Sequence, residues 1–91
     1  MRSRIPLLKK ALPLKRMVLF GSYATGRHTV ASDIDLLVVY AGDVQENAYA
    51  LVRRTLGVLR LEPHVYSEGE YELVQETVNR MIQKGIEVDA P

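Results

Sequence analysis

The feature that most constrains this chain is a nearly continuous apolar run at residues 34–40, in which Asp35 is the single charged residue. Strands that are buried on both faces read as continuous aliphatic and β-branched runs, whereas strands with one wet face alternate. Together with Asp33, which precedes the run, residues 33–40 are therefore predicted to form a buried central strand. A sheet is thus expected at the centre of the fold.

Two shorter apolar segments are also predicted to be strands. Residues 17–20 form an apolar run that Gly21 ends. Residues 86–88 carry apolar side chains at both ends and can add a short last strand. Lys15 and Arg16, just before the first of these segments, are expected to belong to a solvated basic face.

Residues 58–66 alternate between polar and apolar side chains. The alternation places Glu62 and His64 on one polar face of a strand, because successive side chains of a strand point to opposite faces. Pro63 lacks the N–H that a central strand requires, so it is expected near an edge of the sheet or near the end of its strand.

Helical patterns occur both before and between these strands. Residues 3–12 are expected to form a short helix that stops before Pro13. Residues 44–56 carry a helical apolar stripe, and Asp43 with Glu46 forms a D-x-x-E capping box at its start.

A further helix follows the alternating strand. Ser67 and Glu70 form a second capping box, Met81 belongs to the apolar stripe that faces the core, and Gly85 is expected to end the helix. The element order α-β-β-α-β-α, with a short last strand, predicts an α/β (α+β) fold. Its expected architecture is a small mixed sheet with helices packed on it.

Composition bounds the class of protein. The 91 residues suffice for a single domain, 1–91, and 47% apolar with 25% charged residues is ordinary for a globular domain. The net charge of +1 argues against a dedicated nucleic-acid surface. The chain has no cysteine, and no apolar run approaches the about 20 residues that span a bilayer. We therefore expect a soluble cytoplasmic domain without a membrane partner.

The motif that carries chemistry is Gly21-Ser22, which ten residues separate from Asp33-Ile34-Asp35. Side chains at positions i and i+2 of a strand point to one face, about 6.5–7 Å apart at Cα. Two carboxylates placed there repel each other, and a shared divalent cation relieves that repulsion. Mg²⁺ takes one or two carboxylates together with substrate phosphates. Asp33 and Asp35 are therefore candidate Mg²⁺ ligands.

Gly21 and Ser22 fall where the strand at 17–20 ends. Glycine lets a backbone approach a ligand closely. The N–H groups that follow, for example in a helical turn over residues 23–25, can hold phosphate oxygens together with the Ser22 hydroxyl. One half of the motif thus suits a triphosphate, and the other half suits a metal bound to the same phosphates.

The pattern Gly-Ser, ten residues, then Asp-x-Asp resembles the signature of the DNA polymerase β-like nucleotidyltransferase superfamily. Residues 21–27, Gly-Ser-Tyr-Ala-Thr-Gly-Arg, and 32–36, Ser-Asp-Ile-Asp-Leu, are similar to its minimal nucleotidyltransferases (MNT). The resemblance covers essentially the whole chain, because the fold of that family has the element order predicted above. It implies an Mg²⁺-dependent transfer of a nucleoside monophosphate from a nucleoside triphosphate to an acceptor hydroxyl, with release of pyrophosphate.

The resemblance also implies roles for single residues. Gly21 and Ser22 would bind the β- and γ-phosphates, and Asp33 and Asp35 would bind Mg²⁺. A third carboxylate on a later strand would complete the metal site and help to deprotonate the acceptor hydroxyl. Glu62 is our candidate for it, although the family often has aspartate there, and a surface ion pair explains this glutamate nearly as well.

Two further side chains have weaker claims to the site. Arg27 can reach a phosphate or can be an exposed loop charge, and the sequence favours neither. His64 shares the face of Glu62 and can orient a carboxylate or a substrate, but a hydrogen-bonded structural histidine is the simpler interpretation.

The sequence leaves three functions as alternatives. In the first, the chain transfers AMP from ATP to a small helical partner of the HEPN type, as the resemblance to MNT antitoxins implies. In the second, it is a binding module that neutralises or scaffolds a partner protein without catalysis. In the third, it is a catalytic subunit for a small-molecule acceptor, and another chain or a homo-oligomer supplies the rest of the pocket. The intact motif argues against the second, and the resemblance makes the first the leading hypothesis.

Overall fold

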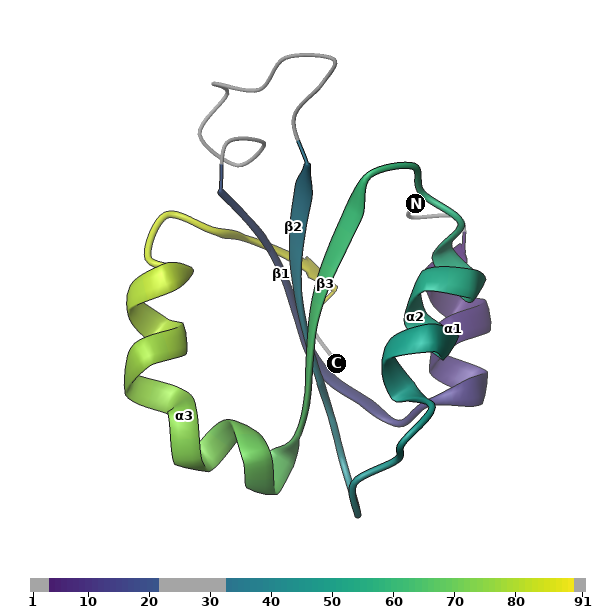
Figure 1. The fold of residues 1–91 in the computed structure, drawn as a ribbon, viewed down its shortest axis with the longest axis horizontal. Helices are drawn as coiled ribbons and strands as arrows, with labels where there is room; N and C mark the ends of the chain where they lie inside the picture. The colour runs from purple at the N-terminus through teal and green to yellow at the C-terminus, as the bar shows by residue number, and fades with distance from the viewer. Residues whose placement is uncertain (1–3, 22–32, 90–91) are drawn as a thin grey trace.

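The computed structural model describes residues 4–21 and 33–89 of the chain. Its elements are α1 (Ile5–Ala11), β1 (Leu14–Phe20), β2 (Ile34–Tyr40), α2 (Ala48–Leu56), β3 (Leu61–Ser67), α3 (Glu68–Met81) and β4 (Ile86–Asp89) (Figure 1). This order confirms the predicted arrangement and its short last strand. No helix within the described ranges has the length and apolar character needed to cross a membrane.

The described strands form one mixed sheet in the order β3-β2-β1-β4. β1 is antiparallel to β2 and to β4, whereas β2 and β3 are parallel. As predicted, β2 is a central strand, and its residues 36–40 are all buried. β3 is an edge strand, in agreement with the prediction from Pro63.

Helices cover both faces of this sheet (Figure 1). α1 and α2 lie over one face, where their apolar sides form a core with Leu36 and Val38 of β2. α3 lies over the other face, where Val78 packs in a second core with Leu37 and Val39. Alternate side chains of β2 therefore enter two different cores, and this explains why its apolar run is continuous.

The connection from β2 to α2 differs from the prediction. α2 begins at Ala48, later than expected, and the residue at its N-cap makes no side-chain capping hydrogen bond. The predicted capping box of Asp43 and Glu46 is therefore wrong. The backbone N–H of Gln45 instead donates to the hydroxyl of the buried Tyr40 at 2.9 Å. A core side chain thus holds this connection outside the helix.

β1 and β3 differ in extent from the predicted strands. β1 begins earlier, at Leu14, where it already pairs with Tyr40 of β2. β3 begins later, at Leu61, because the chain turns just before it at Arg60, whose φ is +64°. Within β3 the predicted alternation starts as expected, since Leu61 is buried and Glu62 is exposed.

The start of α3 agrees with the prediction, but its end does not. Ser67 Oγ accepts a hydrogen bond from the Glu70 N–H at 3.2 Å, and Glu70 Oε1 accepts one from the Ser67 N–H at 3.0 Å. This capping box is confirmed. The helix ends at Met81, which is 42% exposed rather than part of the core. Gly85 lies in the following turn, where its N–H donates to the Ile82 carbonyl at 2.7 Å.

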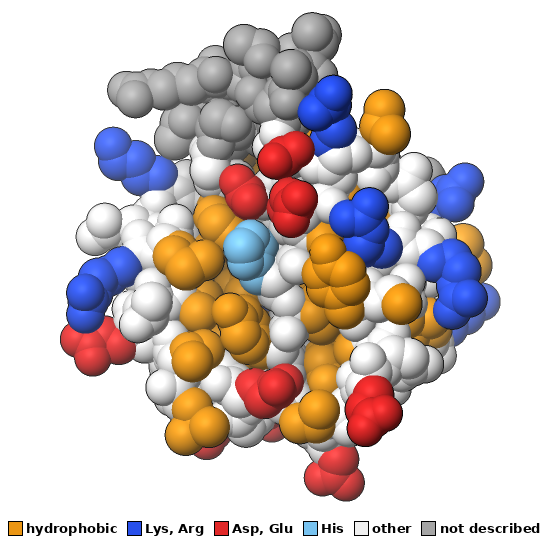
Figure 2. Space-filling model, in the orientation of Figure 1, with side chains coloured by type: hydrophobic (Ala, Val, Ile, Leu, Met, Phe, Trp, Pro, Cys, Tyr) orange, Lys and Arg blue, Asp and Glu red, His pale blue; other side chains and the backbone are white. Residues whose placement is uncertain are grey.

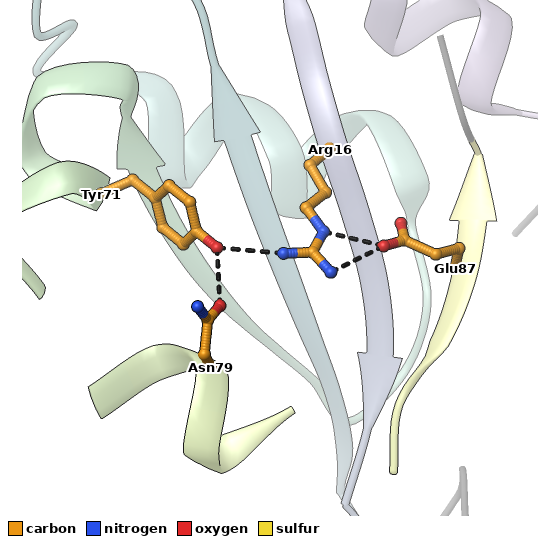
Figure 3. A network of polar contacts seen from close by, with 4 residues as sticks. All are labelled: Arg16, Tyr71, Asn79 and Glu87. Atoms are coloured by element: carbon orange, nitrogen blue, oxygen red, sulfur yellow. Dashed lines mark hydrogen bonds and ion pairs between the residues drawn. The ribbon is translucent and has the colours of Figure 1, made fainter. Parts of the chain in front are cut away.

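A polar network joins α3 to the sheet (Figure 3). Arg16 of β1 donates from Nε to Glu87 Oε1 at 2.8 Å and from Nη1 to the Tyr71 hydroxyl at 3.0 Å. Tyr71 in turn donates to Asn79 Oδ1 at 2.9 Å. Burial lowers the pKa of Arg16, but its contacts with Glu87 and Tyr71 outweigh burial and raise that pKa above its ordinary value. Arg16 therefore links β1 to α3 and β4 while its side chain stays 37% exposed, which is compatible with the predicted solvated face.

Candidate functional site

Three strands bring predicted site residues to one end of the sheet. In the antiparallel pair of β1 and β2, Phe20 lies opposite Asp35, and Gly21 follows directly. In the parallel pair of β2 and β3, Glu62 lies beside Asp35. Neighbouring strands are only about 4.8 Å apart. The structure therefore gathers Gly21, Asp35 and Glu62, which are far apart in the sequence.

The carboxylate of Asp35 lies between β1 and β3. Its Oδ1 atom is 3.4 Å from His64 Nε2. Its Oδ2 atom lies against Gly21, because a Cβ built on Gly21 would overlap this oxygen and would lie 3.3 Å from Asp35 Cγ. The side chains of Asp35 and His64 are 32% and 33% exposed, so the carboxylate is both oriented and open to solvent. Such a group can bind a hydrated cation.

Gly21 meets two structural requirements at the end of β1. Its φ is +78°, in the left-handed region that glycine adopts without a steric penalty. It also leaves room for Asp35, since any side chain at this position would meet the carboxylate. The backbone of Gly21 therefore lies against the candidate metal ligand Asp35. Its predicted approach to a phosphate stays a prediction.

Asp33 precedes β2 and is exposed. The N–H of the next residue, Ile34, donates to the Arg60 carbonyl at 2.8 Å and so fixes the start of β2 against the turn before β3.

Acidic side chains gather beside a histidine on the face of the molecule that Figure 2 shows. Within residues 4–21 and 33–89, no group of three His, Asp or Glu side chains is arranged to hold a metal ion by itself.

Two candidates for nucleotide binding, Ser22 and Arg27, lie outside the residues that the structure describes. The helical turn predicted over residues 23–25 lies outside them as well. The roles given to Ser22 and Arg27 stay predictions.

A cavity of about 250 Å³ lies beside Gly21. Ile86 of β4 pairs with Leu19 of β1, so the turn before β4 runs past the end of β1. The described residues that line the cavity are Phe20, Gly21, Arg80, Met81, Gln83, Lys84 and Gly85. Arg80 and Lys84 make one wall basic. The sequence analysis did not identify Arg80 and Lys84 as neighbours of Gly21, because only the pairing of β4 with β1 brings them close to it.

A family model described as nucleotidyltransferase domain matches residues 5–89 of the chain. No curated protein matches the chain. Among solved structures, a protein from Sulfolobus solfataricus described as a nucleotidyltransferase is similar, with a TM-score of 0.63 and 23% identity. The match covers 94% of this chain and 73% of that one.

Two other similar structures are toxin–antitoxin complexes. One contains AMP-PNP, and its match has a TM-score of 0.68 and 20% identity over 99% of this chain and 73% of that one. The other is a tri-AMPylated HEPN toxin from Shewanella oneidensis in complex with an MNT antitoxin. Its match has a TM-score of 0.61 and 20% identity over 99% of this chain and 70% of that one. These similarities confirm the predicted fold.

Proposed function

The chain belongs to the nucleotidyltransferase domain family, and we propose that it transfers AMP from ATP to an acceptor hydroxyl on a partner protein, with Mg²⁺ as its cofactor. The observation that carries this proposal is the position of Asp35, between Gly21 on one side and Glu62 on the other. This arrangement sets two carboxylates at the end of β1, where the Gly-Ser half of the motif begins.

The residues at this end of the sheet fit Mg²⁺ chemically. Asp33, Asp35 and Glu62 offer carboxylate oxygens, which hard cations prefer as ligands. Asp33 and Asp35 would hold the ion, and Glu62 would be the third carboxylate. When bound there with the triphosphate, Mg²⁺ would neutralise negative charge on the phosphates and on the attacking oxygen.

The side chains and backbone of this chain would position the substrates. Gly21, Ser22 and Arg27 hold the β- and γ-phosphates in this proposal. Glu62 accepts the proton of the acceptor hydroxyl, and the oxygen attacks the α-phosphorus in line. The bond from the α-phosphorus to the bridging oxygen breaks at the same time, and pyrophosphate leaves. Positioning of this kind supplies much of the catalysis in phosphoryl transfer.

The proposed acceptor is a small helical protein of the HEPN type. Two structures of similar fold support this choice, since one holds a tri-AMPylated HEPN toxin beside an MNT antitoxin and the other holds AMP-PNP. We place the reaction in the cytoplasm, where ATP and Mg²⁺ are both available.

Transfer of label tests the proposal. The chain is incubated with [α-³²P]ATP, Mg²⁺ and the helical protein that co-purifies with it, and mass spectrometry then looks for an added nucleoside monophosphate on the partner. Asp35→Asn should abolish transfer and keep the fold. Asp43→Asn is the matched control, because Asp43 is an exposed aspartate in the connection between β2 and α2, away from the site.

The alternatives give different results in the same assay. If wild-type chain labels no protein, and Asp35→Asn still protects cells from the partner, the chain is a binding module. If label moves only to a small molecule, the chain acts on a small-molecule acceptor. Either result would contradict transfer to a protein.

A further inference from the structure

His64 contacts the candidate ligand Asp35 diagonally across two strands. The register partner of His64 in β2 is Leu37, whereas the partner of Asp35 in β3 is Glu62. The imidazole therefore reaches back along the sheet, and its Nε2 lies 3.4 Å from Asp35 Oδ1. We propose that His64 is a positioning residue, which fixes the Asp35 carboxylate for its cation. This inference rests on the proposed function and assigns to that reaction a residue outside the motif.

The direction of the hydrogen bond follows from the chemistry of the two groups. An ionised carboxylate only accepts hydrogen bonds, whereas a ring nitrogen of histidine donates when it carries the proton. His64 Nε2 is therefore the donor and Asp35 Oδ1 the acceptor. The other nitrogen of the ring, Nδ1, is not needed for this contact.

The ring of His64 is itself held in place by β1. Its centroid lies 5.1 Å from that of Phe20, with the two ring planes tilted by 53°. Phe20 is only 6% exposed and lies opposite Asp35 in the pairing of β1 with β2. The core thus fixes Phe20, Phe20 packs against His64, and His64 contacts the carboxylate.

The two oxygens of Asp35 face neighbours on opposite sides, one on β3 and one just after β1. Oδ1 faces His64 on β3, and Oδ2 faces Gly21 at the end of β1. Each oxygen keeps a second lone pair for a cation, because a carboxylate offers about four acceptor sites. Hydrogen bonds from outer residues to metal ligands typically change metal affinity or activity by about 10–100-fold. His64 is placed to supply such a bond.

Two substitutions of His64 separate positioning from packing. His64→Ala removes both ring and donor, whereas His64→Gln keeps a donor nitrogen at a similar distance from the backbone. Tyr66→Phe is the control, because Tyr66 follows on the same face of β3 and packs with the second core. For each protein we would measure the Mg²⁺-dependent affinity for a non-hydrolysable ATP analogue by calorimetry, kcat for labelling, and Tm.

We expect His64→Ala to lose binding and activity, and His64→Gln to restore them because glutamine supplies a hydrogen-bond donor. His64→Ala should weaken Mg²⁺-dependent binding and lower kcat, each by about 10–100-fold. His64→Gln should recover most of both, and Tyr66→Phe should match the wild type. A lower Tm in the two His64 variants with unchanged affinity and kcat would overturn the proposal, because His64 would then serve packing alone.

The same experiment distinguishes this inference from the function on which it rests. Wild-type protein that neither binds the analogue with Mg²⁺ nor transfers label would overturn both. An active wild type with an equally active His64→Ala would overturn only the positioning role.

Discussion

The backbone of Gly21 and the carboxylate of Asp35 adjoin so closely that a Cβ on Gly21 would overlap Asp35 Oδ2. Gly21 directly follows β1, and the last residue of β1, Phe20, lies opposite Asp35 of β2. The glycine of the motif therefore shapes the acidic half of the motif directly. This effect is separate from the phosphate contact proposed for the same glycine.

Gly21→Ala is expected to lower activity more than stability. A left-handed backbone costs a non-glycine residue about 1–2 kcal/mol, and the new methyl group would also displace the Asp35 carboxylate. A misplaced catalytic group can reduce kcat by about 100-fold. Gly42→Ala is the matched control, because Gly42 has a φ of +90°, and among the described residues nothing beyond its chain neighbours lies within 4 Å of a Cβ there. Urea unfolding should show similar losses in both variants, while only Gly21→Ala loses transfer activity.

Glu62 is tested by three substitutions in the labelling assay. Glu62→Gln should lower kcat by about 100- to 10,000-fold, the usual contribution of a general base. Glu62→Asp should retain much more activity, since it keeps a carboxylate at this position. Glu46→Gln, an exposed change outside the site, should have no effect. Normal kcat in Glu62→Gln would remove this residue from the proposed mechanism.

The capping box of α3 should contribute measurably to stability. Ser67→Ala removes the acceptor of the Glu70 N–H, and the free energy of unfolding is expected to fall by about 1 kcal/mol. Asn47→Ala is the control at the start of α2, where the N-cap side chain makes no capping hydrogen bond. Chemical denaturation should find little change for Asn47→Ala. Equal losses in the two variants would contradict the assignment of the cap.

The network around Arg16 is expected to stabilise the fold without affecting the reaction. Tyr71→Phe removes the hydroxyl that links Arg16 to Asn79, and unfolding free energy should fall by about 1 kcal/mol. Tyr49→Phe, at a tyrosine that is 47% exposed on α2, should leave stability unchanged. Labelling activity should stay normal in both. A large loss of activity in Tyr71→Phe would show that the network does more than hold α3.

Sequence patterns correctly predicted the features that depend on residues close together in the chain. The apolar run of β2 and the Ser67–Glu70 box each depend on neighbouring residues, and both are present in the structure. The box predicted from Asp43 and Glu46 failed because the hydroxyl of Tyr40 binds the Gln45 N–H instead. The residues of that segment alone do not reveal that a buried tyrosine hydroxyl accepts a hydrogen bond from its backbone.

The arrangement of the candidate site depends on strand register, which could not be predicted from the sequence patterns. The alternation of β3 placed Glu62 and His64 on one face, but only the parallel pairing of β2 with β3 puts Glu62 beside Asp35. The basic wall that includes Lys84 likewise depends on the pairing of β4 with β1. Residue spacing could indicate the chemistry, and register decided which side chains meet.

The most direct test of a shared cation at Asp33 and Asp35 is a crystal structure of the chain with Mn²⁺ and a non-hydrolysable ATP analogue. Anomalous scattering would locate the metal without reference to the protein. We predict Mn²⁺ in direct coordination with both aspartates and with phosphate oxygens of the analogue. Manganese bound elsewhere, or the two carboxylates on opposite faces of the sheet, would contradict the account.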